Sequence, residues 1–307
     1  MSLFGKLPYL KENQVISGQW ERNSYKVLKL LGSGGNGAVY LVEDGAGLLK
    51  ALKFSMDLFG LNSEYRVLVF LRSCSELQSL NAIPAVFEID DCQINSKTYY
   101  FIVMEYCQGE NLRNFRGRLG IKDAALVARK VAVFLECLHR TGFVFGDLKP
   151  GNIIFNFKTE QIYIIDYGSV TVKGGKLRQF TPSYDRATWQ AGARVADESY
   201  DMFSLGMLLV VLVSGNVRRG RYKHPDKVIE EISGRIPNSA VREVVRKALS
   251  QNALTCKDIV CRLSVDEIET GFSQNSVSRL KKVLINLVGL ASVASLIMSL
   301  IYFKQFH

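Results

Sequence analysis

The chain has 307 residues, enough for one large domain or two lobes around a sizeable core. Hydrophobic residues make up 48% of it and charged residues 22%, a balance that excludes an intrinsically disordered chain. The formal net charge of +10 favours acidic partners, while three histidines and six cysteines without a CxxC pair argue against a zinc site or a histidine-based triad.

The first hundred or so residues are predicted to form a small twisted sheet with one helix. Residues 1–24 are a polar lead-in without an apolar run long enough for a signal peptide, which favours a reducing cytosolic location. A helix is expected over 60–73, where apolar residues recur at helical spacing, and strands at 85–89 and 99–104. Three earlier strand-like runs are separated by glycine-rich turns: YKVLKLLG, AVYLVED and LLKALKF.

After residue 107 the chain is predicted to be mainly helical. An amphipathic helix over 123–141 has Asp123 as its expected N-cap, and a short hairpin lies around 153–166. A very apolar helix is expected at 201–213. The remaining elements are two helices and a polar linker, at 226–234, 238–249 and 265–282.

The C-terminal run 283–303 contains 21 residues without a charge. As a helix it would be roughly 30 Å long, which matches the hydrocarbon core of a bilayer, whereas a buried core helix seldom lies at a chain end behind a polar linker. Basic residues precede the run, so the positive-inside rule places the long N-terminal part in the cytoplasm. The sequence predicts a single-pass protein of the cell membrane with a short tail, 304–307.

Small residues recur every four positions along this run, at Ala291, Ser295 and Ser299. Such a small-xxx-small face lets two membrane helices pack closely, which would support a homodimer. The same spacing can also arise by chance in a run rich in alanine and serine.

The segment GSGGNGAVY lies between two strand-like runs. Its glycines let backbone N–H groups approach a triphosphate closely, because no side chain intervenes. A dinucleotide-binding turn would be followed by a helix, whereas here a second strand follows, so a hairpin flap over phosphates fits better. The predicted ATP-binding residues of this flap are Gly32, Ser33, Gly34, Gly35, Asn36, Gly37 and Val39.

The next strand carries Lys53, whose ammonium group could reach the α- and β-phosphates. Glu64, on the following helix, is the natural counter-charge. An ordinary surface lysine is the alternative, but the preceding glycine loop argues against it.

The stretch FVFGDLKPGNIIF places Asp147, Lys149 and Asn152 in apolar surroundings. Asp147 could orient and deprotonate an attacking hydroxyl, and Lys149 could neutralise a transferred phosphoryl group. The amide oxygen of Asn152 suits Mg²⁺. Asp166, at the end of the strand IYIID, could bridge a second metal position to the β- and γ-phosphates.

In this order the four groups resemble the signature motifs of Hanks-type bacterial serine/threonine protein kinases, over about residues 25–262. The resemblance implies an α+β, bilobal protein-kinase-like fold, with a small β-rich N-lobe over 25–106 and a helical C-lobe over 107–264. It implies ATP and Mg²⁺ (or Mn²⁺) as cofactors and protein serine or threonine hydroxyls as acceptors. Asp147 and Lys149 would be catalytic, and Asn152 and Asp166 would hold the metal.

Other matches to the family follow from FIVMEYCQGENL, FTPSY and YDMFSLGMLL. Met104 resembles the gatekeeper, and Glu105 and Cys107 resemble the adenine-binding hinge. Thr181 and Pro182 resemble the loop that accepts the substrate peptide. Asp201 resembles the buried helix under the catalytic loop.

Two departures from the family pattern stand out. The usual His-Arg before the catalytic aspartate is Phe145-Gly146; Phe145 can fill the apolar column of that histidine, but Gly146 cannot grip a phosphorylated loop. We therefore expect a non-RD kinase whose activity does not depend on phosphorylating Ser169, Thr171, Thr181 or Ser183. The usual Ala-Pro-Glu and its partner arginine are both missing, which leaves no orphan charge.

Two other functions remain open. Small-molecule phosphotransferases of the aminoglycoside and choline kinase type also read GDL…N, but the full glycine loop, Lys149-Pro150 and the TPxY segment favour a protein substrate. Lys149 together with Thr181 favours serine or threonine over tyrosine. A nucleotide-binding pseudokinase scaffold would be expected to have lost a lysine, aspartate or metal ligand, and none is lost.

The Phe-Gly-Asp motif with a C-terminal membrane helix is similar to the YabT-type membrane kinases of spore-forming Bacilli. That similarity implies autophosphorylation and a role in sporulation or DNA maintenance. The basic run VRRGRYKH, residues 217–224, could hold DNA phosphates or acidic lipid headgroups, or could be a solvated loop.

Overall fold

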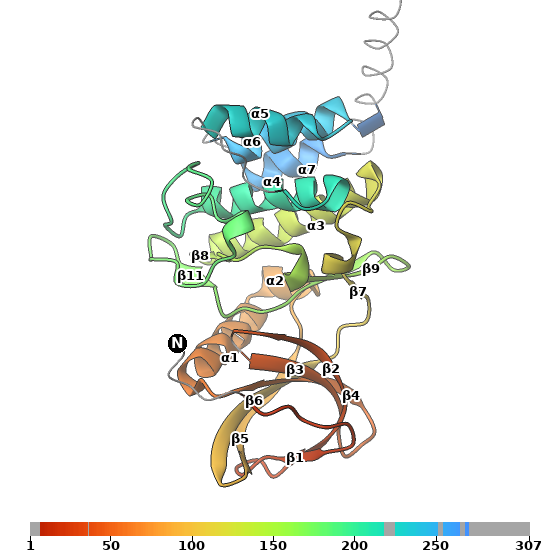
Figure 1. Cartoon of the computed structure of the whole chain (residues 1–307), viewed down its shortest axis with the longest axis vertical. Helices are drawn as coiled ribbons and strands as arrows, with labels where there is room; N and C mark the ends of the chain where they lie inside the picture. Colours follow the sequence, from red (N-terminus) through yellow and green to blue (C-terminus); the bar gives the residue numbers. More distant parts are fainter. Residues whose placement is uncertain (1–6, 36, 218–224, 251–253, 265–267, 270–307) are drawn as a thin grey trace, which may run out of the picture.

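The chain is organised as two lobes, one rich in strands and one rich in helices (Figure 1). The computed structural model describes residues 7–35, 37–217, 225–250, 254–264 and 268–269. The strand-rich lobe contains the sheet that ends at Glu105, and it lies below the helical lobe in the view of Figure 1. This arrangement confirms the predicted bilobal α+β fold.

Six strands form one antiparallel sheet in the spatial order β1-β2-β3-β4-β6-β5. Along the first part of β2, Tyr25 and Val27 are buried and Lys26 is exposed, the alternation expected of a sheet with one packed face. The register sets Val39 opposite Lys53, so these two residues share a face. The strands are β1 (Val15–Ser17), β2 (Ser24–Gly34), β3 (Gly37–Glu43), β4 (Leu49–Ser55), β5 (Val86–Ile94) and β6 (Lys97–Glu105).

The chain before β2 packs onto this sheet. Leu10 and Ile16 are only 1% and 2% exposed and belong to the same hydrophobic cluster as Phe101. The Tyr40 hydroxyl accepts a hydrogen bond from the Leu10 backbone N–H at 3.1 Å. The described part of the lead-in therefore has two apolar anchors in the core of the lobe.

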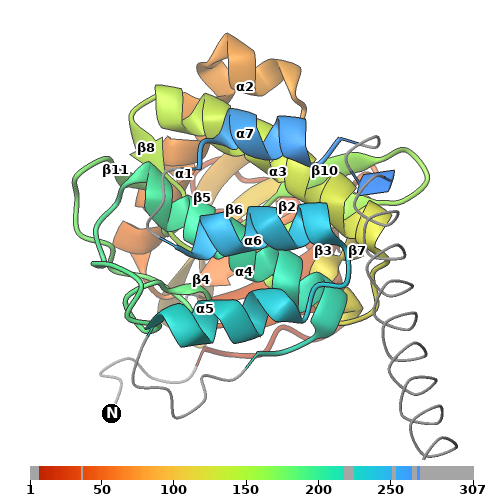
Figure 2. The ribbon, with the colours of Figure 1, turned by 90° about the horizontal axis from the view of Figure 1, so that it is seen from above.

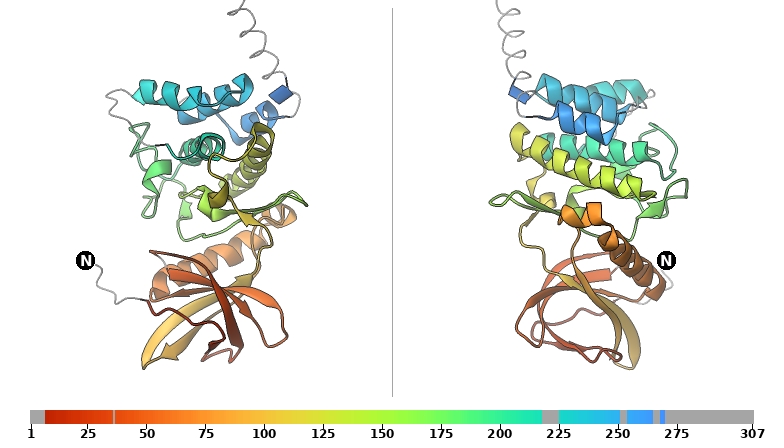
Figure 3. Two further views of the ribbon diagram at one scale, coloured as in Figure 1. Left: turned by 45° about the vertical axis from the view of Figure 1, so that its right-hand side comes forward. Right: turned by 180° about the vertical axis from the view of Figure 1, so that it is seen from behind.

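Helix α1 (Leu58–Ser73) lies against the sheet and reaches toward the helical lobe (Figure 3). It begins where the Asp57 carboxylate accepts a hydrogen bond from the Gly60 N–H at 3.0 Å, an N-cap. Leucines recur at helical spacing on its buried face, and Glu64 is the one charged residue buried with them. This helix therefore carries a single carboxylate into the junction of the lobes.

The helical lobe is layered around α4 (Glu198–Ser214), as Figure 2 shows from above. Residues 200–212 of α4 are all buried, which explains why most of this helix is apolar. Helix α4 contacts α3 and α6, while α5 packs on α6 and α7 packs on α3. These helices are α3 (Ile121–Arg140), α5 (Pro225–Gly234), α6 (Ser239–Leu249) and α7 (Cys256–Arg262).

Short elements line the side of this lobe that faces the sheet. Strands β7, β9 and β10 form a small antiparallel sheet, and β8 pairs with β11. The short elements are α2 (Ser75–Ser79), β7 (Glu110–Asn111), β8 (Phe143–Val144), β9 (Ile153–Asn156), β10 (Gln161–Ile164), β11 (Thr171–Val172) and three 3-10 turns, η1 (Leu112–Phe115), η2 (Pro150–Asn152) and η3 (Pro182–Tyr184).

The N-terminus of α3 corrects one prediction. The helix begins at Ile121 with Gly120 as its N-cap, so Asp123 is not the cap. Asp123 lies instead in the first turn, where a negative charge still favours the helix dipole.

Among the described residues, no helix is long and apolar enough to cross a membrane. The predicted span 283–303, with its small-residue face and its tail, lies outside the described residues. The same holds for residues 218–224 of the basic run and for nearly all of the linker predicted at 265–282.

Candidate active site

Three charged side chains from different elements meet at the junction of the lobes. Lys53 comes from β4, Glu64 from α1, and Asp166 follows β10. The Lys53 ammonium donates to Glu64 Oε2 at 2.5 Å and to Asp166 Oδ1 at 2.9 Å. Lys53 thus ties the strand-rich lobe to the start of residues 166–197, which link β10 to α4 and are called the 166–197 segment below.

The surroundings shift the pKa of each of these three groups differently. Burial acts to lower the pKa of Lys53, but the charges of Glu64 and Asp166 outweigh burial and hold that pKa above its usual value. For Glu64, burial is the larger effect and raises the pKa of the carboxyl group, although the Lys53 charge acts to lower it. For Asp166, burial is outweighed by Lys53 and then by Lys149, so its pKa is lowered and its carboxylate stays ionised.

The glycine flap has room on its open side. A Cβ atom built on Gly32, Gly34 or Gly35 would meet nothing within 4 Å. At Gly37, by contrast, φ is +132° and a Cβ would lie 2.3 Å from the Phe54 carbonyl oxygen, so this position requires glycine. Ser33 pairs with Ala38 across the hairpin, and Asn36 lies outside the described residues. The flap therefore leaves backbone accessible where phosphates would approach.

The predicted hinge follows β6. The Glu105 carboxylate turns back to accept the backbone N–H of Ala85 at 3.0 Å, so the side chain braces β5. Cys107 is 5% exposed, and its thiol lies 3.8 Å from the Glu105 carbonyl oxygen. Burial raises the pKa of this thiol, as the Glu105 charge also does. Met104 is half-buried opposite Ala51 of β4.

Asp147, Lys149 and Thr181 form a second group. The Lys149 ammonium donates to Asp147 Oδ2 at 2.5 Å and to Thr181 Oγ1 at 3.0 Å. Asp147 Oδ1 is buried and has no hydrogen-bond partner among the described residues. A buried carboxylate oxygen without a donor costs free energy, and an incoming hydroxyl group would supply that donor. Pro182 is exposed and begins the turn η3 directly after Thr181.

Asn152 and Asp166 are suited to hold Mg²⁺ or Mn²⁺. The amide nitrogen of Asn152 donates to the Asp147 carbonyl oxygen at 2.9 Å, which leaves the amide oxygen as the group available to a metal. The Asn152 carbonyl oxygen accepts the Ile165 N–H at 2.9 Å, so the chain next to Asp166 is fixed beside Asn152. No cluster of three or more His, Cys, Asp or Glu side chains lies within the described ranges.

Asp201 of α4 fixes the chain just before Asp147. Its buried carboxylate accepts the backbone N–H groups of Phe145 at 2.8 Å and Gly146 at 2.9 Å, and His139 Nε2 lies 2.8 Å from it. The Phe145 ring packs edge-on against Tyr167, with centroids 5.7 Å apart. These contacts agree with the expected roles of α4 and of the apolar column.

Gly146 is required by its backbone and by its neighbours. Its φ is +81°, in the left-handed region that favours glycine. A Cβ there would lie 2.7 Å from Leu177 Cδ2 and 3.0 Å from the Ser169 carbonyl oxygen. Leu177 is 2% exposed and packs with Val144 and Tyr200. A leucine of the 166–197 segment therefore fills the space that an arginine side chain would need.

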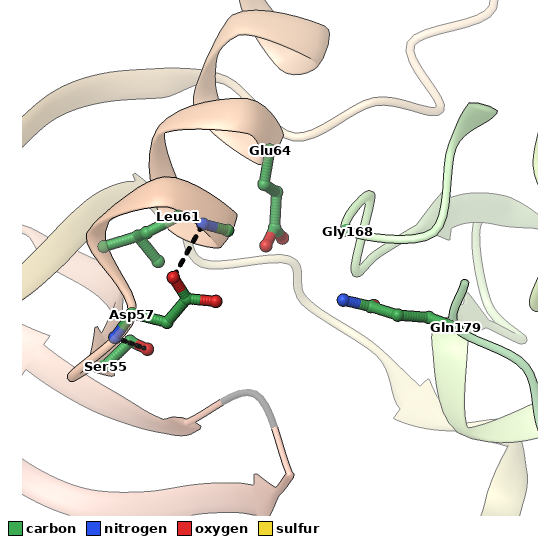
Figure 4. Close-up of a pocket in the computed structure, with 7 residues that line it drawn as sticks. Ser55, Asp57, Leu61, Glu64, Gly168 and Gln179 are labelled. Atoms are coloured by element: carbon green, nitrogen blue, oxygen red, sulfur yellow. Dashed lines mark hydrogen bonds between the residues drawn. The ribbon is translucent and has the colours of Figure 1, made fainter. Parts of the chain in front are cut away.

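A small pocket lies behind the Lys53–Glu64 pair, between the first turns of α1 and the 166–197 segment. Figure 4 shows Glu64 projecting from α1 toward Gly168 and Gln179 on the opposite side of the gap. A Cβ on Gly168 would lie 3.2 Å from Gln179 Oε1 and 3.6 Å from Glu64 Oε2. The absence of a side chain at Gly168 thus lets the segment pass close to the trio.

The end of the 166–197 segment is held by two ion pairs that the sequence analysis missed. Asp185, fully buried, accepts Arg194 Nη2 at 2.6 Å, and Arg186 Nη2 donates to Asp197 at 2.5 Å. The signal was present in DRATWQAGARVAD, where the two charges of one end recur in reverse order at the other. These pairs fix the end of a segment that lacks the usual Ala-Pro-Glu.

Comparison with known proteins agrees with this geometry. Residues 25–274 match the protein kinase domain family. The chain is 34% identical over 243 residues to serine/threonine-protein kinase YabT of Bacillus subtilis (strain 168), covering 78% of this chain and 69% of that one. It is 29% identical over 269 residues to a probable serine/threonine-protein kinase of Clostridium perfringens, of whose length it covers only 37%.

The solved structure of vaccinia related kinase 3 shares the fold, with a TM-score of 0.62 at 15% identity, over 84% of this chain and 90% of the other. The fold, the family match and the named relatives all point the same way. The chain belongs to the protein kinase family and is a protein-serine/threonine kinase.

Proposed function

We propose that this kinase binds ATP between its lobes and transfers the γ-phosphoryl group to serine or threonine hydroxyls of proteins, its own included. Lys53, held by Glu64, binds the α- and β-phosphates under the glycine flap. Asp147 orients the acceptor hydroxyl and takes its proton, and Lys149 offsets charge on the transferred group. A divalent metal held by Asn152 and Asp166 neutralises phosphate charge when bound.

The observation that supports this proposal is the position of Lys53, within hydrogen-bond distance of both Glu64 and Asp166. One ammonium group between a carboxylate of each lobe requires that both lobes be closed upon it. The Lys149 charge also acts on the Asp166 carboxyl, so the acceptor side and the metal side of the site lie close together.

Lys53→Ala and Asp147→Asn test these roles. Each is expected to lower phosphate transfer from radiolabelled ATP to protein by about a hundredfold or more, because loss of a positioned base or phosphate ligand has effects of that order. Lys26→Ala is a control in the same sheet, since Lys26 is an exposed lysine of β2 outside the group formed by Lys53, Glu64 and Asp166. Undiminished transfer by folded Lys53→Ala would contradict the assignment, and phosphoamino-acid analysis of the product should give phosphoserine or phosphothreonine.

We also propose that residues 283–303 anchor the kinase to the cell membrane with its catalytic lobes in the cytoplasm. The uncharged length of this run supports the proposal. The full chain should sediment with membranes after a high-salt wash, and deletion of 283–307 should release it. Recovery of the intact chain in the soluble fraction would contradict the anchor, and cross-linking of the membrane-bound chain tests the homodimer expected from Ala291, Ser295 and Ser299.

The basic run 217–224 supports a role for DNA or acidic lipid in activation. Autophosphorylation at low salt should then rise on adding DNA or anionic vesicles and fade at high salt; no response to either would remove this proposal. A role in sporulation or DNA maintenance stays a prediction, which phosphoproteomics of cells carrying the wild type or Asp147→Asn can test.

A further inference from the structure

A basic loop borders the acceptor side of the active site. The residues from β7 to α3 include η1 and carry three exposed arginines, Arg113, Arg116 and Arg118. This loop is fastened to the end of α4 by the Gly117 N–H, which donates to the Val211 carbonyl oxygen at 2.9 Å. The backbone of this loop is therefore held against the core of the helical lobe.

Arg113 lies against the catalytic loop. Its Nη2 and Nε atoms would be 3.3 and 3.6 Å from a Cβ built on Gly151, the residue before Asn152. The backbone around it is fixed as well, because Asn111 Oδ1 accepts the Arg113 N–H at 3.0 Å and Asn111 Nδ2 donates to the Gly151 carbonyl oxygen at 2.9 Å. The guanidinium group thus borders the segment that carries Asp147.

Arg116 lies on the other side of the acceptor position. Its guanidinium group lies close enough to the phenol of Tyr184, the last residue of the turn that begins at Pro182, to act on the pKa of that phenol. Burial raises the pKa of Tyr184 to about 12; Arg116 acts to lower it and the Asp147 charge acts to raise it. Tyr184 therefore lies near both Arg116 and the catalytic aspartate.

Within the described part of the chain, these two cations have no acidic partner. Neither Arg113 nor Arg116 forms an ion pair with a carboxylate of the described residues, although Arg140, Arg186, Arg194, Arg235 and Arg246 do. The part of α4 that receives the loop, residues 208–213, is entirely apolar. The one acidic residue of the loop is Glu110, which is exposed on β7. The positive charge beside the acceptor is thus available to a ligand.

We propose that Arg113 and Arg116 form a subsite for an acidic side chain of the protein substrate, a few residues from the phosphorylated serine or threonine. This inference rests on the proposed function and adds a substrate class to it. Charge-assisted hydrogen bonds from guanidinium to carboxylate give both attraction and direction, and they favour substrates whose Asp or Glu lies at a fixed distance from the acceptor.

A peptide set with one acceptor serine, in which Asp, Ala or Lys is placed in turn at each flanking position, tests the subsite. The full chain is expected to show, at one or two positions, a kcat/KM about tenfold higher for Asp than for Ala, mainly through KM. Arg113→Gln/Arg116→Gln should reduce this ratio to near one, and Arg113→Glu/Arg116→Glu should invert it in favour of Lys. Arg113→Lys/Arg116→Lys should keep a preference for Asp, because the charge remains.

Lys11→Gln/Lys26→Gln is the matched control, since it removes two exposed positive charges at the far end of the strand-rich lobe and should keep the ratio. Peptides phosphorylated without an acidic preference, or with a basic preference that Glu110→Gln abolishes, would overturn the subsite and leave the kinase assignment intact. No phosphate transfer to any peptide or protein would overturn both.

Discussion

Asp185 shows how one residue in the 166–197 segment depends on its neighbours. Its buried carboxylate accepts hydrogen bonds from Arg194, from both the backbone and hydroxyl of Thr188, and from the Tyr200 hydroxyl at 2.9 Å. Burial alone would raise the pKa of Asp185, but these donors, Arg194 foremost, lower it to about 2. The carboxylate is therefore better stabilised in the folded protein than in the unfolded chain.

This shift predicts an acid dependence. Because the pKa of Asp185 is lower in the folded state than the usual value near 3.9, its contribution is complete above about pH 4 and is lost as the pH falls toward 2. Asp185→Asn should lower stability at pH 7 by about 1–3 kcal/mol and should flatten the decline of the urea midpoint between about pH 4 and pH 2. Parallel declines in wild type and variant would contradict this origin of the acid sensitivity.

Gly146 and Leu177 couple the 166–197 segment to the chain before Asp147. Gly146→Ala should be destabilising by about 1 kcal/mol or more, because a positive φ and a contact with Leu177 both oppose a Cβ. Leu177→Ala removes part of that contact, so the double variant should lose less than the sum of the two single losses. Thermal midpoints and autophosphorylation of the four proteins measure the coupling; strict additivity would show that Leu177 does not occupy the space beside Gly146.

For helices and strands, the sequence predicts the positions of the charged site residues better than it predicts where the elements begin and end. The positions of four charged residues could be predicted from the sequence. Lys53 and Glu64 lie on a predicted strand and the helix after it, and Asp147 and Asp166 lie in short motifs at spacings that resemble the family. The hairpin of β5 and β6 is longer than the predicted strands 85–89 and 99–104, because β5 extends to Ile94 and β6 begins at Lys97. Its turn is confined to Asn95 and Ser96, both with positive φ, while Asp90 is buried within β5 and accepts the Trp20 N–H at 3.1 Å.

The missed contacts have a common physical reason. Leu177 packs into a space left by a glycine, and Arg116 contacts Tyr184 across a long stretch of chain, so no local pattern marks either partner. Leu10 ends a short apolar run that shows neither helix nor strand periodicity, and its burial depends on Tyr40 and the rest of the N-lobe cluster. Such partners are set by tertiary packing rather than by sequence periodicity.

For the whole molecule, the N-terminal segment is expected to stabilise one lobe selectively. Leu10→Ala should cost about 2–5 kcal/mol of local stability, because a leucine with 1% exposure leaves a cavity in the N-lobe core. Hydrogen exchange should therefore accelerate in β2 and β3 more than in α3 and α4. Lys11→Gln, an exposed neighbour, should leave the exchange unchanged, and equal acceleration in both lobes would contradict a lobe-specific role.

The contacts of Asp201 limit which mutations can change the turnover of this enzyme gradually in evolution. The same carboxylate holds the backbone at Phe145 and Gly146 and lies against His139. The backbone before the catalytic aspartate is thus held by a residue of the buried helix α4. A change at Asp201 is therefore expected to disturb both the catalytic loop and the core of the helical lobe. Mutations that change turnover in small steps are therefore expected at contacts on the periphery of the site rather than at Asp201.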